Sequence, residues 1–234
     1  MSLPSTAVAG RTHRLIASRH PTVGVFDDLT DDPEELRAAF LLEMASSPRH
    51  GALAGRLALL MPEEMLSGPS AAIVMAAFLY TDARGGRFHD HRLGAWYAGR
   101  ALETAIAETL YHNQRRLRLS AGGFPNRIQV RELIGDLALE LSDIRGLVSA
   151  RPELYDPDPD RYAAPQAFAA ALRWPAEGAG RCNGLVYASV RHIGGENVCL
   201  FWPTAVPRPL RQGAHLEYAW DRSGRSSVMK LTKV

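Results

Sequence analysis

The chain has 234 residues, of which 46% are hydrophobic, and it carries a formal net charge of +2. A chain of this length can bury one large core, and its nearly balanced charge excludes a global field that would attract nucleic acid. The chain has only two cysteines, without a close pair, and no apolar leader segment, which predicts a cytoplasmic protein. Its longest apolar run, residues 71–80, is too short to cross a membrane.

Residues 33–80 are predicted to be mostly helical. The sequence Asp-Pro-Glu-Glu at 32–35 has the pattern of a helix N-terminus, with Asp32 as the cap, a proline in the first turn and Glu35 completing a capping box. Apolar residues then recur at helical spacing, at Leu36, Phe40, Leu41 and Met44. Two further apolar segments, at 52–60 and after Gly68-Pro69, extend this helical region.

From residue 85 onward the pattern alternates between strands and helices. The expected elements are a strand at 94–98, a helix at about 102–112, strands between 128 and 144, and a helix at 166–174. Two strand pairs, 185–190 with 198–202 and 216–220 with 228–234, each flank a glycine-containing turn, which is typical of antiparallel hairpins. The predicted fold class is therefore α+β, with a helical insertion near the N-terminus.

Familiar cofactor and metal motifs are incomplete in this sequence. Residues 178–184 approach a dinucleotide fingerprint, but the third glycine comes one residue late and precedes a strand rather than a helix. His89 and His91 flank Asp90 without an evident third ligand, and the segment 108–112 lacks the first histidine of a zinc-protease helix. The sequence therefore predicts no metal site.

Several segments together resemble the RES-domain family, which is named for Arg, Glu and Ser. They are Gly-Gly-Arg-Phe at 85–88, Trp-Tyr-Ala-Gly at 96–99, Glu-Thr-Ala-Ile-Ala-Glu at 103–108, Asp-Ile-Arg-Gly at 143–146, the strand and hairpin at 183–203, and His-Arg-Leu-Ile at 13–16. The resemblance predicts one RES-type domain over residues 1–234, with its core signature region at 85–221. The helical stretch resembles only the longer, ParT-type branch.

The resemblance implies a fold like that of ADP-ribosyltransferases, with an antiparallel or mixed sheet and flanking helices. It also implies NAD as the substrate and an Xre-type helix-turn-helix antitoxin as the partner of a toxin. Transfer of ADP-ribose to a protein target is the favoured reaction, and hydrolysis or phosphorolysis of NAD is the alternative. A non-catalytic nucleotide-binding module, or an interaction module that docks a partner on residues 33–80, represents another class of function.

Roles for individual residues follow from the resemblance and from the chemistry of N-glycosidic cleavage, which builds positive charge on the ribose. Glu108 is the candidate carboxylate that stabilises this charge, with Glu103 expected to be solvated or capping. Tyr97 offers a face for nicotinamide and Ser189 a neutral hydrogen-bond donor, so both are candidates for catalysis and for NAD binding. Arginine is suited to a pyrophosphate, and the candidates are Arg14 and Arg87, with Arg19 as a substitute.

Each of these roles has a structural alternative. Glu108 could be an exposed helical carboxylate, Tyr97 a core aromatic, and Ser189 a residue that satisfies backbone groups. Arg87 could be a surface cation of a loop, and Arg14 could pair with the acidic block at 27–35.

Overall fold

The computed structural model describes residues 3–20, 30–43, 50–177 and 180–232. Within these residues, strands form a seven-stranded mixed sheet with the order β1-β2-β5-β4-β3-β6-β7. The strands are β1 (Ser5–Ala17), β2 (Trp96–Gly99), β3 (Asn126–Asp143), β4 (Gly184–Ala188), β5 (Glu196–Leu200), β6 (Arg211–Trp220) and β7 (Ser226–Leu231). With five α-helices beside the sheet, the predicted α+β class is confirmed.

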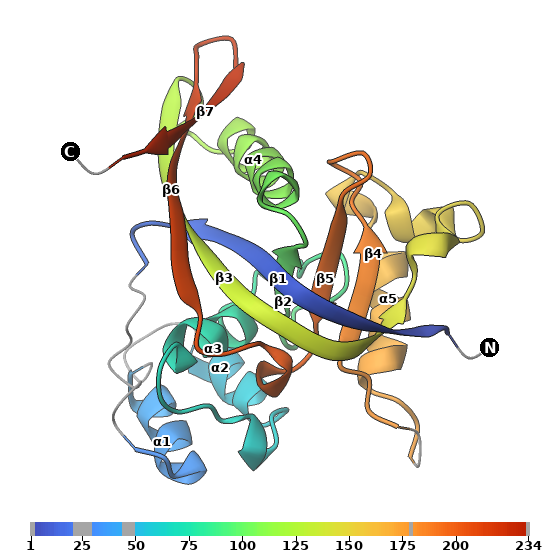
Figure 1. Cartoon of the computed structure of the whole chain (residues 1–234). Helices are drawn as coiled ribbons and strands as arrows, with labels where there is room; N and C mark the ends of the chain where they lie inside the picture. The colour runs from blue at the N-terminus through green and yellow to red at the C-terminus, as the bar shows by residue number, and fades with distance from the viewer. Residues whose placement is uncertain (1–2, 21–29, 44–49, 178–179, 233–234) are drawn as a thin grey trace.

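The sheet consists of two halves that meet at two narrow junctions. β1 and β3 pair antiparallel along their length, from Ser5 opposite Ser142 to Ala17 opposite Val130. β1 is paired with β2 only at His13 and Gly99, and β3 is paired in parallel with β4 only at Ser142 and Asp143. The half formed by β1, β3, β6 and β7 therefore curves away from the half formed by β2, β5 and β4 (Figure 1).

The region predicted to hold several strands between 128 and 144 is one strand, β3. Its pairing with β6 shifts register between Arg131 and Leu133. The extra residue is in β6, because Gly213 and Ala214 together lie opposite Glu132, while β3 pairs with β1 without interruption. The apolar residues of β3 instead change from even to odd positions, so Val130 packs in a cluster with the helix that follows β2, whereas Leu133, Leu137 and Leu141 belong to the main core on the opposite face.

The predicted helical stretch near the N-terminus is confirmed in its described residues. It contains α1 (Pro33–Glu43), α2 (His50–Leu57), the short 3-10 helix η1 (Pro62–Glu64) and α3 (Ala71–Leu79). Asp32 caps α1, since its Oδ1 accepts the N–H groups of Glu34 and Glu35 at 2.8 and 3.2 Å. The capping box differs from the prediction because the Glu35 carboxylate accepts from the Thr30 hydroxyl. Met44 lies outside the described residues.

The helix that follows β2, α4 (Leu102–Arg118), is longer than predicted. Residues 113–118 contain no helix breaker, and three arginines in the last turn interact favourably with the C-terminal end of the helix dipole. Its inner face packs on β1, β3 and β6 through a cluster that includes Ala105, Leu117 and Tyr218. None of the described helices is long and apolar enough to cross a membrane.

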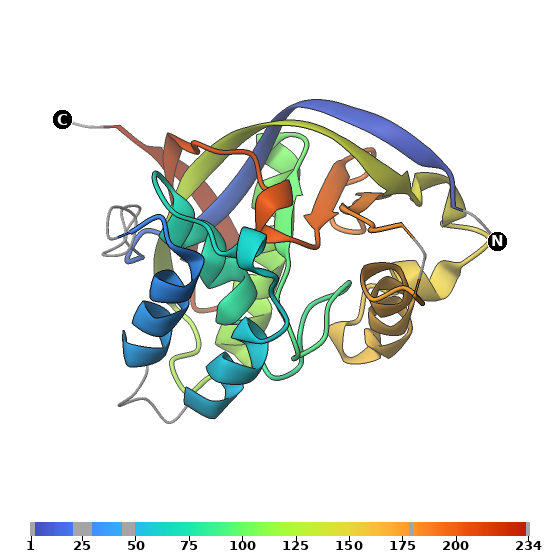
Figure 2. The same ribbon diagram turned by 90° about the horizontal axis from the view of Figure 1, so that it is seen from below.

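The C-terminal hairpins are confirmed, and their strands pair as β4–β5 and β6–β7. The helix expected at 166–174 is α5 (Ala163–Arg173), which is preceded by the 3-10 helices η2 (Arg145–Leu147), η3 (Pro152–Tyr155) and η4 (Pro159–Arg161). A further 3-10 helix, η5 (Pro203–Ala205), follows β5. Figure 2 shows the β1–β3 pair arching over one side of the molecule, with α1–α3 and α5 on the other side.

Candidate functional site

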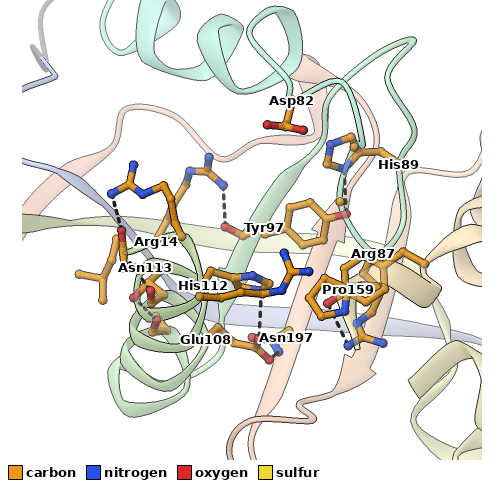
Figure 3. A pocket seen from close by; sticks show the side chains of 18 of the residues that line it. Arg14, Asp82, Arg87, His89, Tyr97, Glu108, His112, Asn113, Pro159 and Asn197 are labelled. Carbon is orange, nitrogen blue, oxygen red and sulfur yellow. Dashed lines mark hydrogen bonds and ion pairs between the residues drawn. The ribbon is translucent and has the colours of Figure 1, made fainter. Parts of the chain in front are cut away.

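A cavity of about 670 Å³ lies between α4, β2 and the segments that precede β2 and α5. This volume is within the range of small-molecule binding sites. Four of the residues singled out from the sequence line it, namely Arg14, Arg87, Tyr97 and Glu108 (Figure 3). The structure therefore brings together side chains that are separated by up to 94 positions in the sequence.

The cavity depends on an abrupt passage from β2 into α4. A side chain at Gly99 would place its Cβ 2.8 Å from the carbonyl oxygen of Ala101 and the amide nitrogen of Ala105. Glycine therefore allows the strand to end directly against the first turn of the helix. This contact sets Tyr97, near the end of β2, opposite Glu108 on the second turn of α4.

Glu108 is held through one of its two carboxylate oxygens. Its Oε1 accepts hydrogen bonds from the Ser189 hydroxyl at 2.7 Å and the Asn197 side-chain amide at 2.9 Å. The nearest basic side-chain nitrogen to Oε2 in the described structure is Nε2 of His112, at 4.0 Å. The orientation of the carboxylate is therefore fixed by neutral donors, and Oε2 is left available to a ligand in the cavity.

The local hydrogen bonds of Ser189 explain why its hydroxyl proton points at Glu108. The hydroxyl oxygen accepts the backbone N–H groups of Arg191 and His192, both at 3.1 Å. A hydroxyl has one proton and two lone pairs, so both acceptor positions are filled and the proton goes to Glu108. Ser189 does not itself line the cavity and contacts it through Glu108.

Asn197 and His112 belong to the site and were missed by the sequence analysis. Asn197 is only 3% exposed on β5, and its buried amide needs the partner that Glu108 provides. It was quoted within the hairpin, but an asparagine in a strand carries no sequence signal for a role. His112 follows Glu108 by four residues on α4, and this spacing places the two side chains on one helix face.

His112 is not a permanent cationic partner of Glu108. Burial lowers the pKa of His112, and the nearby arginines Arg191, Arg87 and Arg115 lower it further, whereas Glu108 acts in the opposite direction. The imidazole is therefore neutral at neutral pH. Its protonation is more costly than that of a solvated histidine because the cavity already holds several guanidinium groups.

Tyr97 is anchored at its hydroxyl group. Its oxygen accepts the backbone N–H of Phe88 at 2.9 Å and lies 2.9 Å from Nδ1 of His89, whose Nε2 contacts the Thr81 hydroxyl at 2.8 Å. Burial raises the pKa of Tyr97 well above its ordinary value and lowers the pKa of His89 to about 3. At neutral pH this wall of the cavity is therefore an uncharged phenol–imidazole pair.

The buried imidazole of His89 predicts that the stability of the protein depends on pH. The pKa of His89 falls from 6.5 to about 3 because of burial and then the charge of Arg173, with Asp90 opposing. The unfolded chain therefore binds more protons between these values, and stability is complete above pH 6.5 and is lost as pH falls. We expect the free energy of unfolding to decrease by about 2–3 kcal/mol from this group between pH 6.5 and 4.5.

Urea unfolding of wild type and His89→Gln at both pH values measures this contribution. Glutamine retains an amide for Tyr97 but cannot titrate, so the difference in stability between the two proteins should narrow as the pH falls. Parallel pH curves for the two proteins would show that His89 does not bind its proton more weakly in the folded state.

Arg14 extends from β1 to the rear of the cavity. It donates from Nη1 to the carbonyl oxygen of Tyr97 at 3.0 Å, and its guanidinium lies 4.5 Å from the centre of the Trp96 ring. Burial lowers its pKa to about 10, so the group stays protonated at neutral pH. Among the described residues, no carboxylate lies within ion-pair distance of Arg14. The alternative pairing with the acidic block is therefore not found for residues 30–35, and Asp27 lies outside the described residues.

Arg87 is 7% exposed and has a structural task that the sequence did not indicate. It donates to the carbonyl oxygens of Leu154 and Asp156 at 3.0 and 2.8 Å and to the Tyr162 hydroxyl at 3.2 Å. These bonds hold the segment around η3 and η4 against the cavity. Its partners are all neutral, so Arg87, like Arg14, adds a positive charge that no carboxylate of the described residues offsets by an ion pair.

Two other candidates lie away from the cavity. Arg19 is exposed in the turn that follows β1, and the structure does not bring it to the lining. Glu103 is exposed on the first turn of α4 and also lies outside the lining, in keeping with a solvated position. Within the described ranges, no group of three or more histidine, cysteine or acidic side chains is arranged to hold a metal ion.

A comparison with protein-family models identifies the family of this chain. The fold and the site define an α+β protein whose cavity combines a fixed carboxylate with Arg14 and Arg87, which form no ion pair with a carboxylate of the described residues. A family model described as RES domain matches residues 64–221. This chain belongs to the RES-domain family. Its match with a solved structure of the M. tuberculosis MbcT–MbcA toxin–antitoxin complex has a TM-score of 0.41 and 11% identity, over 91% of this chain and 86% of that chain. No curated protein matches its sequence.

Proposed function

We propose that this protein cleaves the bond between nicotinamide and ribose in NAD. The observation that carries this proposal is the environment of Glu108, a carboxylate held by two neutral donors on one oxygen while the side chain lines a cavity of about 670 Å³. Arg14 and Arg87 supply two positive charges for a pyrophosphate, which carries two negative charges. A carboxylate can hold a ribose hydroxyl in a binding site as well, and cleavage additionally uses its negative charge beside the ribose.

In the proposed reaction, the glycosidic C–N bond breaks and its electron pair leaves with nicotinamide, which becomes neutral. Positive charge develops on the ribose, and Oε2 of Glu108 stabilises it and accepts a hydrogen bond from a ribose hydroxyl. Ser189 and Asn197 keep the carboxylate in place while the charge develops. Tyr97 packs against the nicotinamide, and its buried, neutral hydroxyl does not add a competing negative charge.

The acceptor then bonds to the ribose carbon and loses its proton. We propose a side chain of a protein target as the acceptor, with water or phosphate as the alternatives. Family membership supports a role as the toxin of a toxin–antitoxin module, with an Xre-type helix-turn-helix antitoxin as its partner. The proposed toxin acts in the cytoplasm, where NAD and the target are available.

The products of NAD turnover distinguish the three acceptors. Purified protein is incubated with NAD, and free nicotinamide, ADP-ribose and ADP-ribose 1-phosphate are separated by chromatography, with and without phosphate in the buffer. A parallel reaction with cell extract and NAD tagged on its adenine detects labelled proteins. Transfer predicts a labelled protein band; accumulation of ADP-ribose or its 1-phosphate without any labelled protein would replace transfer with hydrolysis or phosphorolysis.

The helical stretch offers a test of target recognition. Glu34 and Glu35 are exposed at the start of α1 and do not line the cavity, and Glu43 at its end completes the acidic set. If this stretch is a platform for a protein target, Glu34→Lys with Glu35→Lys should reduce target labelling severalfold and leave basal nicotinamide release unchanged. Labelling at the wild-type level would instead mean that α1 only covers the sheet.

Because lysines at the start of α1 oppose the helix dipole, a Glu34→Gln, Glu35→Gln protein serves as a second variant. It removes the acidic charges without adding positive ones. Reduced labelling in both variants, with unchanged nicotinamide release, attributes the effect to recognition rather than to unfolding of the helix.

A further inference from the structure

Two arginines at the outer end of the cavity converge on one carboxylate. Nη2 of Arg115 lies 2.8 Å from both carboxylate oxygens of Asp160, and Nη1 of Arg84 lies 3.4 Å from one of them. All three side chains line the cavity that also contains Glu108. Within the described residues, Asp160 is the carboxylate that forms ion pairs with both guanidinium groups, so these three side chains together carry a net positive charge.

This cluster lies along the cavity from Glu108 rather than beside it. Arg115 follows Glu108 by seven residues on α4, which corresponds to about two turns, or roughly 10 Å along the helix axis. Arg116 on the same turn also lines the cavity, and its guanidinium donates to the side chain of Asn113. The outer end of the cavity is therefore a second cationic position, separate from Arg14 and Arg87.

The Asp160 side chain can move without disturbing the segment that carries it. Its backbone N–H donates to the Asp158 side chain, and the preceding residues are held by Arg87 on the carbonyl of Asp156 and by Arg191 on the carbonyl of Pro157. The side chain itself is 60% exposed and bonds only to the two arginines within the described structure. An exposed ion pair of this kind is weak, so a stronger anion can replace it.

We propose that Arg84 and Arg115 form an outer phosphate-binding pair, which Asp160 occupies in the free protein and a phosphate group of the dinucleotide takes over on binding. The choice of a dinucleotide as ligand rests on the proposed function. A phosphate offers more negative charge and more acceptor oxygens than a carboxylate, and it suits the planar fork of arginine. The phosphate comes either from the pyrophosphate or from a 2′-phosphate on the adenosine ribose.

Titration of two uncleavable ligands tests this proposal. ADP-ribose and ADP-ribose 2′-phosphate are titrated calorimetrically into wild type, Arg115→Ala and Asp160→Asn. We expect Arg115→Ala to weaken binding roughly tenfold, because a charge-assisted contact is lost. Asp160→Asn should tighten binding about two- to fivefold, because the competing carboxylate is gone.

The opposite signs of the two effects separate a ligand site from a structural ion pair. A structural pair predicts that both variants bind like wild type or that both bind more weakly, and either result overturns the proposal. Arg127→Ala and Glu217→Gln are matched controls because their side chains form an ion pair, at 2.7 Å, that does not line this cavity. These controls should leave both affinities unchanged.

The two ligands also identify the phosphate. If Arg115→Ala weakens the binding of both ligands equally, Arg84 and Arg115 hold the pyrophosphate. If it weakens the binding of ADP-ribose 2′-phosphate alone, they hold the 2′-phosphate. Nicotinamide release is measured separately. If the two variants change ligand affinity in opposite directions but the protein releases no nicotinamide, the phosphate-binding pair is upheld and the proposed reaction is refuted. If wild-type protein binds neither ligand, the phosphate-binding pair is refuted.

Discussion

Replacing Glu108 with glutamine is expected to lower the rate of nicotinamide release by roughly 100- to 1,000-fold, the usual effect of removing one preorganised electrostatic partner. Glutamine keeps an acceptor oxygen for Ser189 and Asn197, so the fold and the position of the side chain should be retained. What is lost is the negative charge on the oxygen that faces the cavity. Initial rates with saturating NAD measure the loss in the chemical step.

Glu103→Gln is the matched control for this experiment. Glu103 is on the same helix but exposed and outside the cavity, so its replacement should leave the rate within about twofold of wild type, as most surface substitutions do. A folded Glu108→Gln protein with a normal rate would remove Glu108 from the mechanism. A larger loss at Glu103 than at Glu108 would transfer the role to the other carboxylate.

Loss of either inner arginine is expected to weaken NAD binding by about 1.5–3 kcal/mol, which corresponds to roughly 10- to 150-fold. Arg14→Ala removes a guanidinium that keeps its charge within the cavity wall. Arg87→Ala should in addition destabilise the fold, because the carbonyl oxygens of Leu154 and Asp156 lose their donor. Calorimetric titration of ADP-ribose into each variant measures the affinity without turnover.

Thermal unfolding separates the two effects at Arg87. Arg87→Lys retains a charge but not the planar fork, so it should recover part of the stability and less of the affinity. Arg211→Ala is the matched surface control, since Arg211 is exposed and pairs with Asp136 on a strand outside the cavity. If Arg14→Ala and Arg87→Ala both bind like wild type, the pyrophosphate lies elsewhere in the cavity, and the outer arginines Arg84 and Arg115 become the better candidates.

The fold could be predicted where local pattern and tertiary context agree. Helix α1 follows from the Asp32 cap and the apolar spacing, and both C-terminal hairpins follow from strand patterns around glycine turns. β3 could not be predicted as one strand, because its apolar residues change from even positions, such as Val130, to odd positions, such as Leu133, and a turn between two strands would give the same pattern. The closing contacts between β1, β2, β3 and β4 are long-range pairings without a local signal.

The residues of the candidate site could be predicted where they belong to a motif of the family. Arg14, Arg87, Tyr97 and Glu108 all line one cavity, although their sequence neighbourhoods differ. The partners that orient them could not be predicted, because hydrogen bonds such as those of Asn197 to Glu108 and of Arg87 to Leu154 depend on packing between distant segments. The same reason applies to Asp160, an acidic residue of a turn-rich segment whose contact with Arg84 and Arg115 spans 76 and 45 positions.

Release of free nicotinamide from NAD by the purified protein tests the central claim most directly. The protein is incubated with NAD labelled in its nicotinamide ring, beside Glu108→Gln protein at the same concentration. We expect labelled nicotinamide to accumulate with wild type in proportion to enzyme and time, and to remain near background with Glu108→Gln. Equal release by both proteins would remove Glu108 from the mechanism. No release by folded wild type that still binds ADP-ribose would contradict the proposed cleavage and leave a nucleotide-binding protein without this reaction.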